Sequence, residues 1–353
     1  MSSPLVSIII PTKNRCALLQ ETLASIRQQT YPHWEAVVVD DSSSDGTADM
    51  LANLTVAEPK IRFIPRTGDV AGANVCRNQG VTASIGHYII FLDSDDLLAP
   101  FCLAQRVNVM IEKPDLDFAV FPCEVFKKTP GDVGLYYNIE TNEQDLDRFL
   151  RLDNPWQIHH PIWHRPALLR VGPWDESLPS WQDWDFHLRA IINGLRYQKF
   201  PSRDCYWRIT ESERKSIGAE YYRNPSHLRA AEALFSEVIA MLKDHNLFSL
   251  TRRRLMAGLY FAISDLWWGC DRHPHNAKRL WAVCRKQGLI GLAEYYESLL
   301  YLSRPQFTGS WRLHHCLERR LPQRYAIFGA PKTVMKTPVN LHISSSHLPT
   351  SRT

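Results

Sequence analysis

The stretch Tyr88-Ile89-Ile90-Phe91-Leu92-Asp93-Ser94-Asp95-Asp96 places an apolar run directly before three carboxylates. A short continuous apolar run of this kind is typical of a β-strand buried on both faces. The acids then lie at the carboxyl edge of a sheet, where open α/β folds bind their ligands. Clustered carboxylates repel one another unless a cation holds them, and hard oxygen ligands suit Mg²⁺ or Mn²⁺. The alternative is that Asp95 or Asp96 caps a helix predicted over residues 97–110.

The pattern outside this stretch predicts alternating strands and helices. Before residue 100, β-branched and apolar runs predict strands over residues 6–10, 34–39, 61–64 and 88–92. Helical spacing of apolar residues predicts helices over residues 15–30 and 48–54, and another helix after the stretch 72–80. This alternation predicts an α/β fold with a doubly wound, mostly parallel sheet. Farther along, the sequence predicts strands over residues 118–126 and 158–164 and helices over 145–152 and 181–192.

The length and composition predict a folded protein of more than one unit. The chain has 353 residues, of which 44% are hydrophobic and 22% charged. Residues 221–330 are predicted to form a helical C-terminal region, and residues 331–353, rich in Ser, Thr, Pro and His, a disordered tail. A net charge of +4 is too small to indicate a nucleic-acid partner. Trp267-Trp268 and Arg252-Arg253-Arg254 suggest a surface that docks on a membrane or partner, with ordinary helix packing as the alternative.

The eight cysteines show no C-x-x-C pair and no His/Cys zinc spacing. This distribution favours reduced thiols in a cytoplasmic protein over a disulfide framework. The N-terminal residues lack the basic and apolar regions of a signal peptide, and no apolar run approaches the roughly 18 residues needed to span a bilayer. Any membrane association is therefore expected to be peripheral, at the inner face of the membrane.

Polar side chains follow the predicted strands at one edge of the sheet. Thr12-Lys13-Asn14-Arg15 follows the first strand, Asp40-Asp41 the second and Arg77-Asn78 the third, and residues 93–96 follow the fourth. Because the carboxyl ends of parallel strands meet at one edge, these side chains are expected to share one crevice. Arginines there can offset phosphate charge, and Asp41 can accept a hydrogen bond from a base or a ribose. The sequence has no G-x-G-x-x-G after the first strand and no P-loop motif, so dinucleotide-binding and P-loop proteins lose their main support.

A second acidic feature is Trp181-Gln182-Asp183-Trp184-Asp185. Asp183 is predicted to lie near the start of an amphipathic helix, between two tryptophans. Tryptophan rings offer flat apolar platforms, and a carboxylate beside them suits a sugar ring whose hydroxyl is to be deprotonated. The alternative is an acidic first helical turn that the helix dipole favours.

These motifs resemble the family 2 glycosyltransferases of the GT-A fold. The segments at residues 6–15, 29–47, 72–80 and 91–96 are similar to the nucleotide-sugar half of that family and occur in the same order. The segments at residues 171–176 and 181–189 look like its acceptor side. The resemblance implies a GT-A domain over residues 1–220, with a nucleotide-sugar half at 1–100 and an acceptor half at 101–220. From residue 220 onward it implies nothing.

The resemblance also implies roles for individual residues. Asp93 and Asp95 would form the D-x-D motif that binds a divalent metal, Mn²⁺ or Mg²⁺, with Asp95 as the direct ligand. Asp183 would be the catalytic base. The implied nucleotide-sugar-binding residues are Thr12, Arg15, Asp41, Arg77, Asp93 and Ser94, and the implied acceptor-side residues are Gln182 and Trp181.

The implied activity is that of an inverting hexosyltransferase. A single sugar would move from a nucleoside-diphosphate sugar, with UDP expected, to a hydroxyl of a glycan or glycolipid acceptor in cell-surface polysaccharide synthesis.

Two positions depart from the family pattern. Gln182 stands where a glutamate is usual, and no histidine follows the run Tyr206-Trp207-Arg208. A module on the same fold that binds nucleotide sugar or carbohydrate without catalysis is therefore the main alternative. A nucleotidyltransferase is a second alternative, although Pro11-Thr12-Lys13-Asn14 is a poor match to the glycine-rich basic loop of that class.

Overall fold

The computed structural model describes residues 3–138, 140–209, 224–271 and 274–302. Its main sheet has seven strands in the order β10-β6-β9-β4-β1-β2-β3. Every neighbouring pair is parallel except those of β9, which runs antiparallel to β4 and β6. This arrangement confirms the predicted α/β fold with a mostly parallel sheet. The strands are β1 (Val6–Thr12), β2 (Trp34–Asp40), β3 (Ile61–Pro65), β4 (Tyr88–Phe91), β6 (Phe118–Val120), β9 (Pro161–His164) and β10 (Tyr197–Lys199).

A second sheet of four strands corrects two predictions. Its order is β5 (Leu97–Leu98), β11 (Cys205–Arg208), β7 (Cys123–Phe126) and β8 (Leu135–Tyr136). The strand predicted over residues 118–126 is therefore two strands in different sheets, divided at Pro122, which has no backbone N–H for a ladder. The helix predicted from residue 97 begins instead at Cys102, as α4 (Cys102–Glu112). Pro100 disfavours helical backbone at the residue before it, so neither Asp95 nor Asp96 caps this helix.

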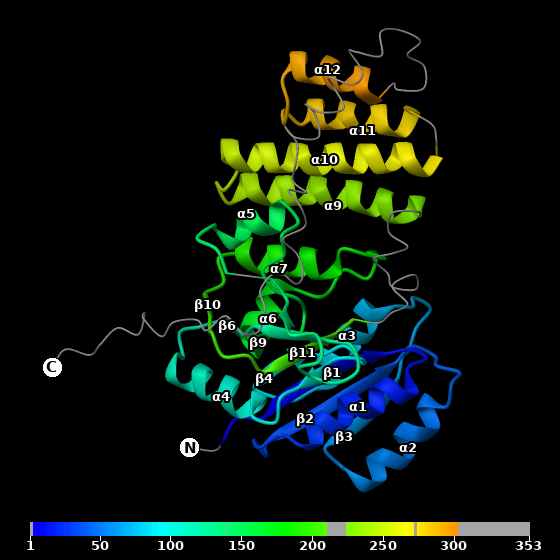
Figure 1. The fold of residues 1–353 in the computed structure, drawn as a ribbon, viewed down its shortest axis with the longest axis vertical. Coiled ribbons are helices and arrows are strands. Elements are labelled where there is room, and N and C mark those ends of the chain that lie inside the picture. The colour runs from blue at the N-terminus through cyan, green and yellow to red at the C-terminus, as the bar shows by residue number, and fades with distance from the viewer. Residues whose placement is uncertain (1–2, 139, 210–223, 272–273, 303–353) are drawn as a thin grey trace, which may run out of the picture.

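Three helices of the first half lie close to the main sheet (Figure 1). They are α1 (Cys16–Arg27), α2 (Thr47–Ala57) and α3 (Ala73–Ala83). Residues 72–80 were predicted to precede a helix, but they form most of α3 itself. Gly80 allows α3 to lie against β1, since a Cβ added there would collide with the Cγ2 of Ile9. This close approach brings Arg77 of α3 over the edge of the sheet.

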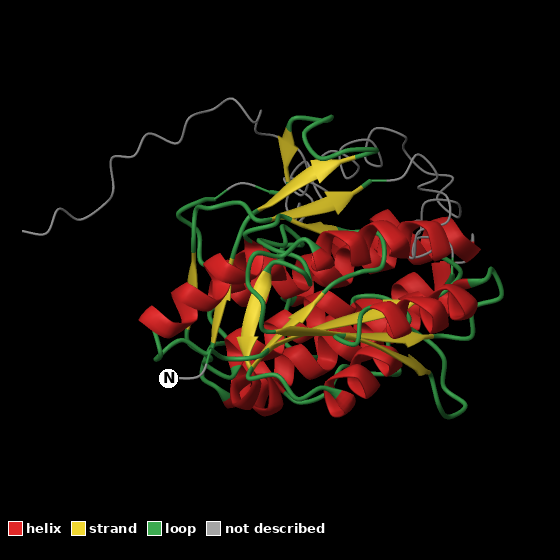
Figure 2. Cartoon of the chain, turned by 90° about the horizontal axis from the view of Figure 1, so that it is seen from below, coloured by secondary structure: helices red, strands yellow, loops and turns green. Residues whose placement is uncertain are grey.

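The main sheet separates two hydrophobic cores, because alternate residues of a strand point to opposite faces. Ile8, Ile10 and Val38 belong to the core that also includes buried side chains of α1 and α4. Ile9 and Val39 belong to a second core, which continues through the acceptor half and reaches Leu302. Figure 2 shows helices on both sides of the sheet strands. The C-terminal helices therefore share a core with one face of the sheet.

The predicted helical C-terminal region is confirmed over the described residues as a stack of four helices (Figure 1). Asn224 caps the first of them, with its side chain accepting a hydrogen bond from the backbone of Ser226 at 3.0 Å. The stack lies over α5 (Asp145–Leu150) and α7 (Gln182–Ile192), beyond α6 (Arg165–Val171). Its members are α9 (Pro225–Asp244), α10 (Leu250–Asp271), α11 (Pro274–Lys286) and α12 (Leu292–Leu302). The division of the chain at residues 100 and 220 stays a prediction, and the predicted tail lies outside the described residues.

Packing accounts for two residues of the proposed docking surface. Trp267 is buried, and its Nε1 donates a 2.7 Å hydrogen bond to Glu232. Arg252 donates to Asp147 at 2.7 Å and to Gln144 at 2.6 Å, and so ties α10 to the start of α5. The docking hypothesis is therefore wrong for these two side chains, and helix packing explains them. No helix in the described part of the chain has both the length and the apolar content to cross a bilayer.

Candidate active site

The acids after β4 form a tight turn, in which the backbone N–H of Asp96 donates to the carbonyl of Asp93 at 3.1 Å. Asp93 remains partly exposed, whereas Asp95 is mostly buried and Ser94 and Asp96 are fully buried. Burial raises the pKa of Asp95, the nearby Arg15 opposes that shift, and the charge of Asp93 adds to it. The turn therefore concentrates negative charge at the carboxyl edge of the sheet.

Two arginines from different elements face these carboxylates. Arg15, just before α1, forms an ion pair with Asp95. Arg77, from α3, places its Nη2 2.9 Å from Asp93 Oδ1, and its guanidinium lies 4.9 Å from the centre of the Trp174 ring. The predicted convergence of Arg15, Arg77 and the acidic turn is therefore present in the structure.

The end of β2 forms a second charged group. Asp41 accepts from Lys13 at 3.2 Å and pairs with Arg66, the residue that directly follows β3. Its backbone N–H donates to the carbonyl of Thr12 at 2.8 Å, which joins the ends of β1 and β2. The Thr12 hydroxyl is buried and has no hydrogen-bond partner among the described residues, so a ligand at this edge would find an unsatisfied polar group there.

Arg77 connects this edge to the acceptor side. Its Nη1 donates to Gln182 Oε1 at 3.1 Å and to Asn74 Oδ1 at 3.2 Å. Asn74 in turn donates to the carbonyl of Asp175 at 2.6 Å, in the loop that leads to α7. Gln182 is therefore an uncharged partner of the arginine that also binds Asp93.

Asp183 is the second residue of α7. Trp181 precedes the helix with left-handed backbone (φ 68°), which turns the chain sharply into the first helical turn. Burial raises the pKa of Asp183 to about 6; the positive charge of Arg77 opposes this shift and the negative charge of Asp93 adds to it. A carboxyl group with this pKa is suited to accept a proton near neutral pH.

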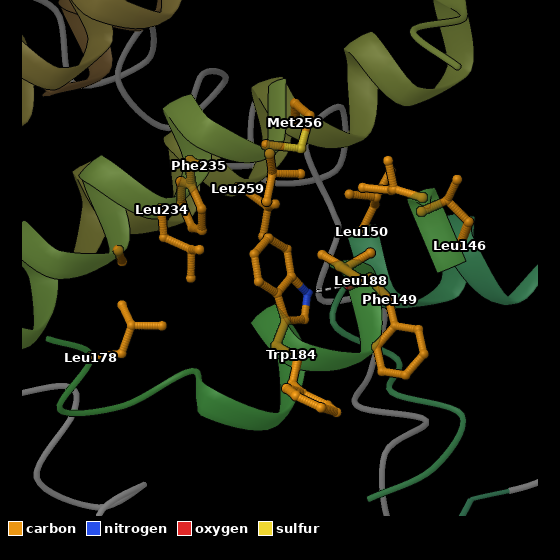
Figure 3. Close-up of a cluster of buried hydrophobic side chains, with 14 of the residues drawn as sticks. Leu146, Phe149, Leu150, Leu178, Trp184, Leu188, Leu234, Phe235, Met256 and Leu259 are labelled. Carbon is orange, nitrogen blue, oxygen red and sulfur yellow. Dashed lines mark hydrogen bonds between the residues drawn. The ribbon is translucent and has the colours of Figure 1, made fainter. Parts of the chain in front are cut away.

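The two tryptophans beside Asp183 have different surroundings. Trp184 is 2% exposed, and its Nε1 donates to the carbonyl of Phe149 at 2.7 Å (Figure 3), so it cannot present a face to a sugar. Trp181 is partly exposed and meets the ring of Phe235 edge-on, with the ring centres 5.4 Å apart. The prediction that both tryptophans offer a flat apolar platform beside Asp183 is therefore wrong for Trp184.

Arg66 and Arg208 also contact the site, and the sequence analysis did not predict either of them as a site residue. Arg66 could have been predicted, because it directly follows the third strand. The sequence analysis assigned Arg77 to the end of that strand instead. Arg208 had no local signal. Its backbone N–H donates to Asp96 Oδ1 at 2.9 Å, its Nε to the carbonyl of Asp95 at 2.8 Å and its Nη2 to Glu21 at 2.6 Å. Arg208 therefore supports the acidic turn from β11, where the family pattern places a histidine nearby.

The acidic turn suits a divalent cation. Asp93 and Asp95 offer hard oxygen ligands of the kind that Mg²⁺ and Mn²⁺ prefer. The repulsion that helps to raise the pKa of Asp95 would fall if a cation bound there. The donor set therefore fits the metal that the resemblance implied.

The chain belongs to the glycosyltransferase family 2, whose family model matches residues 7–173. A PGL/p-HBAD biosynthesis glycosyltransferase of Mycobacterium bovis is 32% identical over 194 residues, which are 55% of this chain and 72% of that protein. TuaG of Bacillus subtilis, a glycosyltransferase assigned to teichuronic acid biosynthesis, is 36% identical over 110 residues, 31% of this chain. The match spans 43% of the length of TuaG.

The fold is also that of solved glycosyltransferases. Staphylococcus aureus TarS, residues 1–349, superposes with a TM-score of 0.61 and 18% identity, and the match covers 90% of this chain and 91% of TarS 1–349. The predicted GT-A type of fold is therefore confirmed. The match extends beyond the family model and includes much of the helical region.

Proposed function

We propose that the protein transfers a single sugar from a nucleoside-diphosphate sugar to an acceptor hydroxyl, with inversion at the anomeric carbon. The observation that carries this proposal is the link from Asp93 through Arg77 to Gln182, the residue before Asp183. It joins a charged edge suited to a diphosphate to a carboxyl group suited to take a proton.

The donor is proposed to bind along the ends of β1, β2 and β4. Asp41 would accept a hydrogen bond from the base, next to Thr12, and Arg15 and Arg77 would offset phosphate charge near Asp93 and Ser94. TarS 1–349 has been solved in complex with UDP and with UDP-GlcNAc, which supports UDP as the first donor nucleotide to test.

A divalent metal is proposed as a cofactor, with Asp95 and Asp93 as the residues that would hold it. When bound, the metal would supply positive charge for the departing diphosphate. Arg15 and Arg77 would remain close enough to share that role, because each already faces one of the two carboxylates.

The proposed chemistry at the acceptor is general base catalysis by Asp183. Its carboxylate would take the proton of the acceptor hydroxyl as the hydroxyl oxygen attacks the anomeric carbon. Gln182 would hydrogen-bond the acceptor and Trp181 would contact its ring. The names of the M. bovis and B. subtilis relatives support a glycan or glycolipid acceptor in cell-surface synthesis. A cytoplasmic site of action, peripheral to the membrane, is also proposed, because the scattered cysteines favour reduced thiols.

The test is a donor screen with the purified protein. UDP-, GDP- and dTDP-sugars are incubated with Mn²⁺ or EDTA, with and without a membrane-glycolipid extract, and release of nucleoside diphosphate is recorded. Release from one donor, lost in EDTA and increased by the extract, is the expected result. Donor binding without release under any of these conditions would identify a non-catalytic binding module instead, and no binding to any donor would refute both.

A further inference from the structure

Three buried side chains that the proposed reaction does not use meet beneath the acidic turn. Cys123 of β7, Cys205 of β11 and His159 each place a ligand atom within 4.8 Å of the others. Cys123 and Cys205 are direct partners in the parallel pair of β7 and β11, so both side chains leave the second sheet on one face. All three residues are fully buried.

The imidazole of His159 is oriented between the thiols and a carboxylate. Its Nε2 lies 3.1 Å from Cys123 Sγ, and its Nδ1 lies 3.3 Å from Asp96 Oδ2. Histidine ligands of metals usually present their second nitrogen to a carboxylate or carbonyl, which fixes the ring and strengthens the ligand. The His159 ring is therefore turned as a metal-ligating histidine is turned.

A buried ion pair holds the backbone around this group. Arg106 makes two hydrogen bonds to Asp204, at 2.8 and 2.7 Å, and a third to the carbonyl of His159 at 3.0 Å. Asp204 directly precedes Cys205, so this one guanidinium positions two of the three segments. Such positioning reduces the conformational cost of bringing the ligands together.

We propose that Cys123, His159 and Cys205 form a three-ligand binding site for a thiophilic metal ion, with Zn²⁺ as the ion to test. Two thiolates and an imidazole are soft ligands that select Zn²⁺ or Cu⁺ over Mg²⁺ and Mn²⁺. Zn²⁺ held by two thiolates and a neutral imidazole forms a complex without net charge, which suits a buried position. The ion ties β7 and β11 to the segment before β9, directly beneath Asp96.

This site is separate from the proposed metal at Asp93 and Asp95, and the inference does not depend on glycosyl transfer. The first test measures bound metal by mass spectrometry in the full chain, purified under reducing conditions without chelator. We expect about one zinc per chain, held by these three protein ligands, and its loss in Cys123→Ala and Cys205→Ala. Cys284→Ala is the matched control, because Cys284 is an equally buried thiol of α11. Zinc that persists in both site variants overturns the proposal.

The second test titrates the metal-stripped wild-type chain with Co²⁺, whose bonds to thiolates give a distinctive near-ultraviolet absorption. We expect this absorption with the wild type and with Cys284→Ala. Asp96→Asn, which alters the partner of His159, should weaken metal affinity by roughly 10- to 100-fold. Because the wild-type chain decides this test, it remains decisive if a site variant does not fold. A wild type without bound zinc and without cobalt–thiolate absorption, or with a disulfide between Cys123 and Cys205, refutes the site.

Discussion

The donor edge and the acceptor wall of the site differ in their electrostatics. The acceptor wall is the start of α7, with Gln182 and Asp183. The donor edge consists of Thr12, Arg15, Asp41, Arg77, Asp93 and Asp95. At the donor edge each of the three carboxylates faces at least one cation. Asp183 forms no salt bridge within the described ranges, and burial raises its pKa to about 6. Carboxylates that face cations are suited to hold charged ligands, whereas a carboxyl group without a salt bridge and with a pKa of about 6 is suited to move a proton.

The two regions also differ in mechanical support. The donor edge lies at the ends of strands that are buried on both faces, so the sheet itself positions it. The acceptor wall lies on α7, whose far side packs against α5 and α9. Figure 3 shows Trp184 of α7 between Phe149 on one side and Leu234, Phe235 and Leu259 of the C-terminal helices on the other. The helical region therefore supports the helix that carries Asp183.

The largest effect that we predict comes from Asp183→Asn. Removal of the proposed base should lower kcat by roughly 10²- to 10⁴-fold, and donor affinity should remain, because the donor edge is unchanged. Steady-state kinetics and donor titration measure the two quantities. Asp185→Asn is the control on the same helix, since Asp185 pairs with Arg189 and should leave kcat near the wild-type value. Equal losses in both variants would contradict the assignment of Asp183 as the base.

The mechanical comparison is tested by Trp184→Ala. Deletion of this buried ring and its hydrogen bond to Phe149 should lower the free energy of unfolding by about 3–5 kcal/mol. Denaturant unfolding measures the change. Leu169→Ala, an exposed leucine of α6, is the control and should change stability by less than about 0.5 kcal/mol. A small effect at Trp184 would mean that α7 does not depend on the C-terminal helices.

Asp95→Ala tests the donor edge in turn. Loss of this carboxylate should lower kcat/KM by roughly 10²- to 10³-fold, the usual result of removing one group that stabilises transition-state charge. Higher Mn²⁺ concentrations should not restore the wild-type value. Asp115→Ala serves as control, because that side chain is 90% exposed. Full activity of Asp95→Ala in the presence of EDTA would refute the proposed metal site.

The pKa of Asp183 predicts a pH dependence. A general base must be deprotonated, so below a pKa of about 6 the active fraction should fall about tenfold for each unit of pH, and above it the rate should level off. A profile of kcat/KM from pH 4.5 to 8 measures this fall in rate at acidic pH. The residual activity of Asp183→Asn should not show this fall. A wild-type profile that is flat between pH 5 and 7 would contradict the assignment.

The smallest predicted effect concerns the tie between α10 and α5. Arg252→Ala removes hydrogen bonds to Asp147 and Gln144 and should lower the free energy of unfolding by about 1 kcal/mol, since the pair keeps some contact with solvent. Denaturant unfolding of Arg252→Ala and of Arg254→Ala measures this loss of stability. Arg254 is the control, because it is an exposed arginine two residues farther along the same helix. An Arg252 variant as stable as the control would show that apolar packing alone holds this end of the stack.

Much of the donor edge could be predicted because its signals are local. The apolar runs that end at Thr12, at Asp40-Asp41 and at Asp93 mark strand ends, and parallel strands bring their ends to one edge. Apolar spacing located α7, which places Asp183 in its first turn. Each of these inferences needs only the neighbouring residues and the 2.0- or 3.6-residue period of the backbone.

Features that depend on contacts between distant segments could not be predicted from the sequence pattern. The sequence spacing of the cysteines indicated no metal site, yet pairing of β7 with β11 sets Cys123 beside Cys205, and the segment before β9 adds His159. Arg208 reaches the acidic turn for the same reason, from a strand more than a hundred residues farther along the chain. Strand pairing and helix packing form these groups, and no periodicity within one segment encodes which distant segment will lie beside it. Local sequence patterns were sufficient to predict the first four strands and the charged edge, and packing between distant segments set the second sheet and the side chains that share a site.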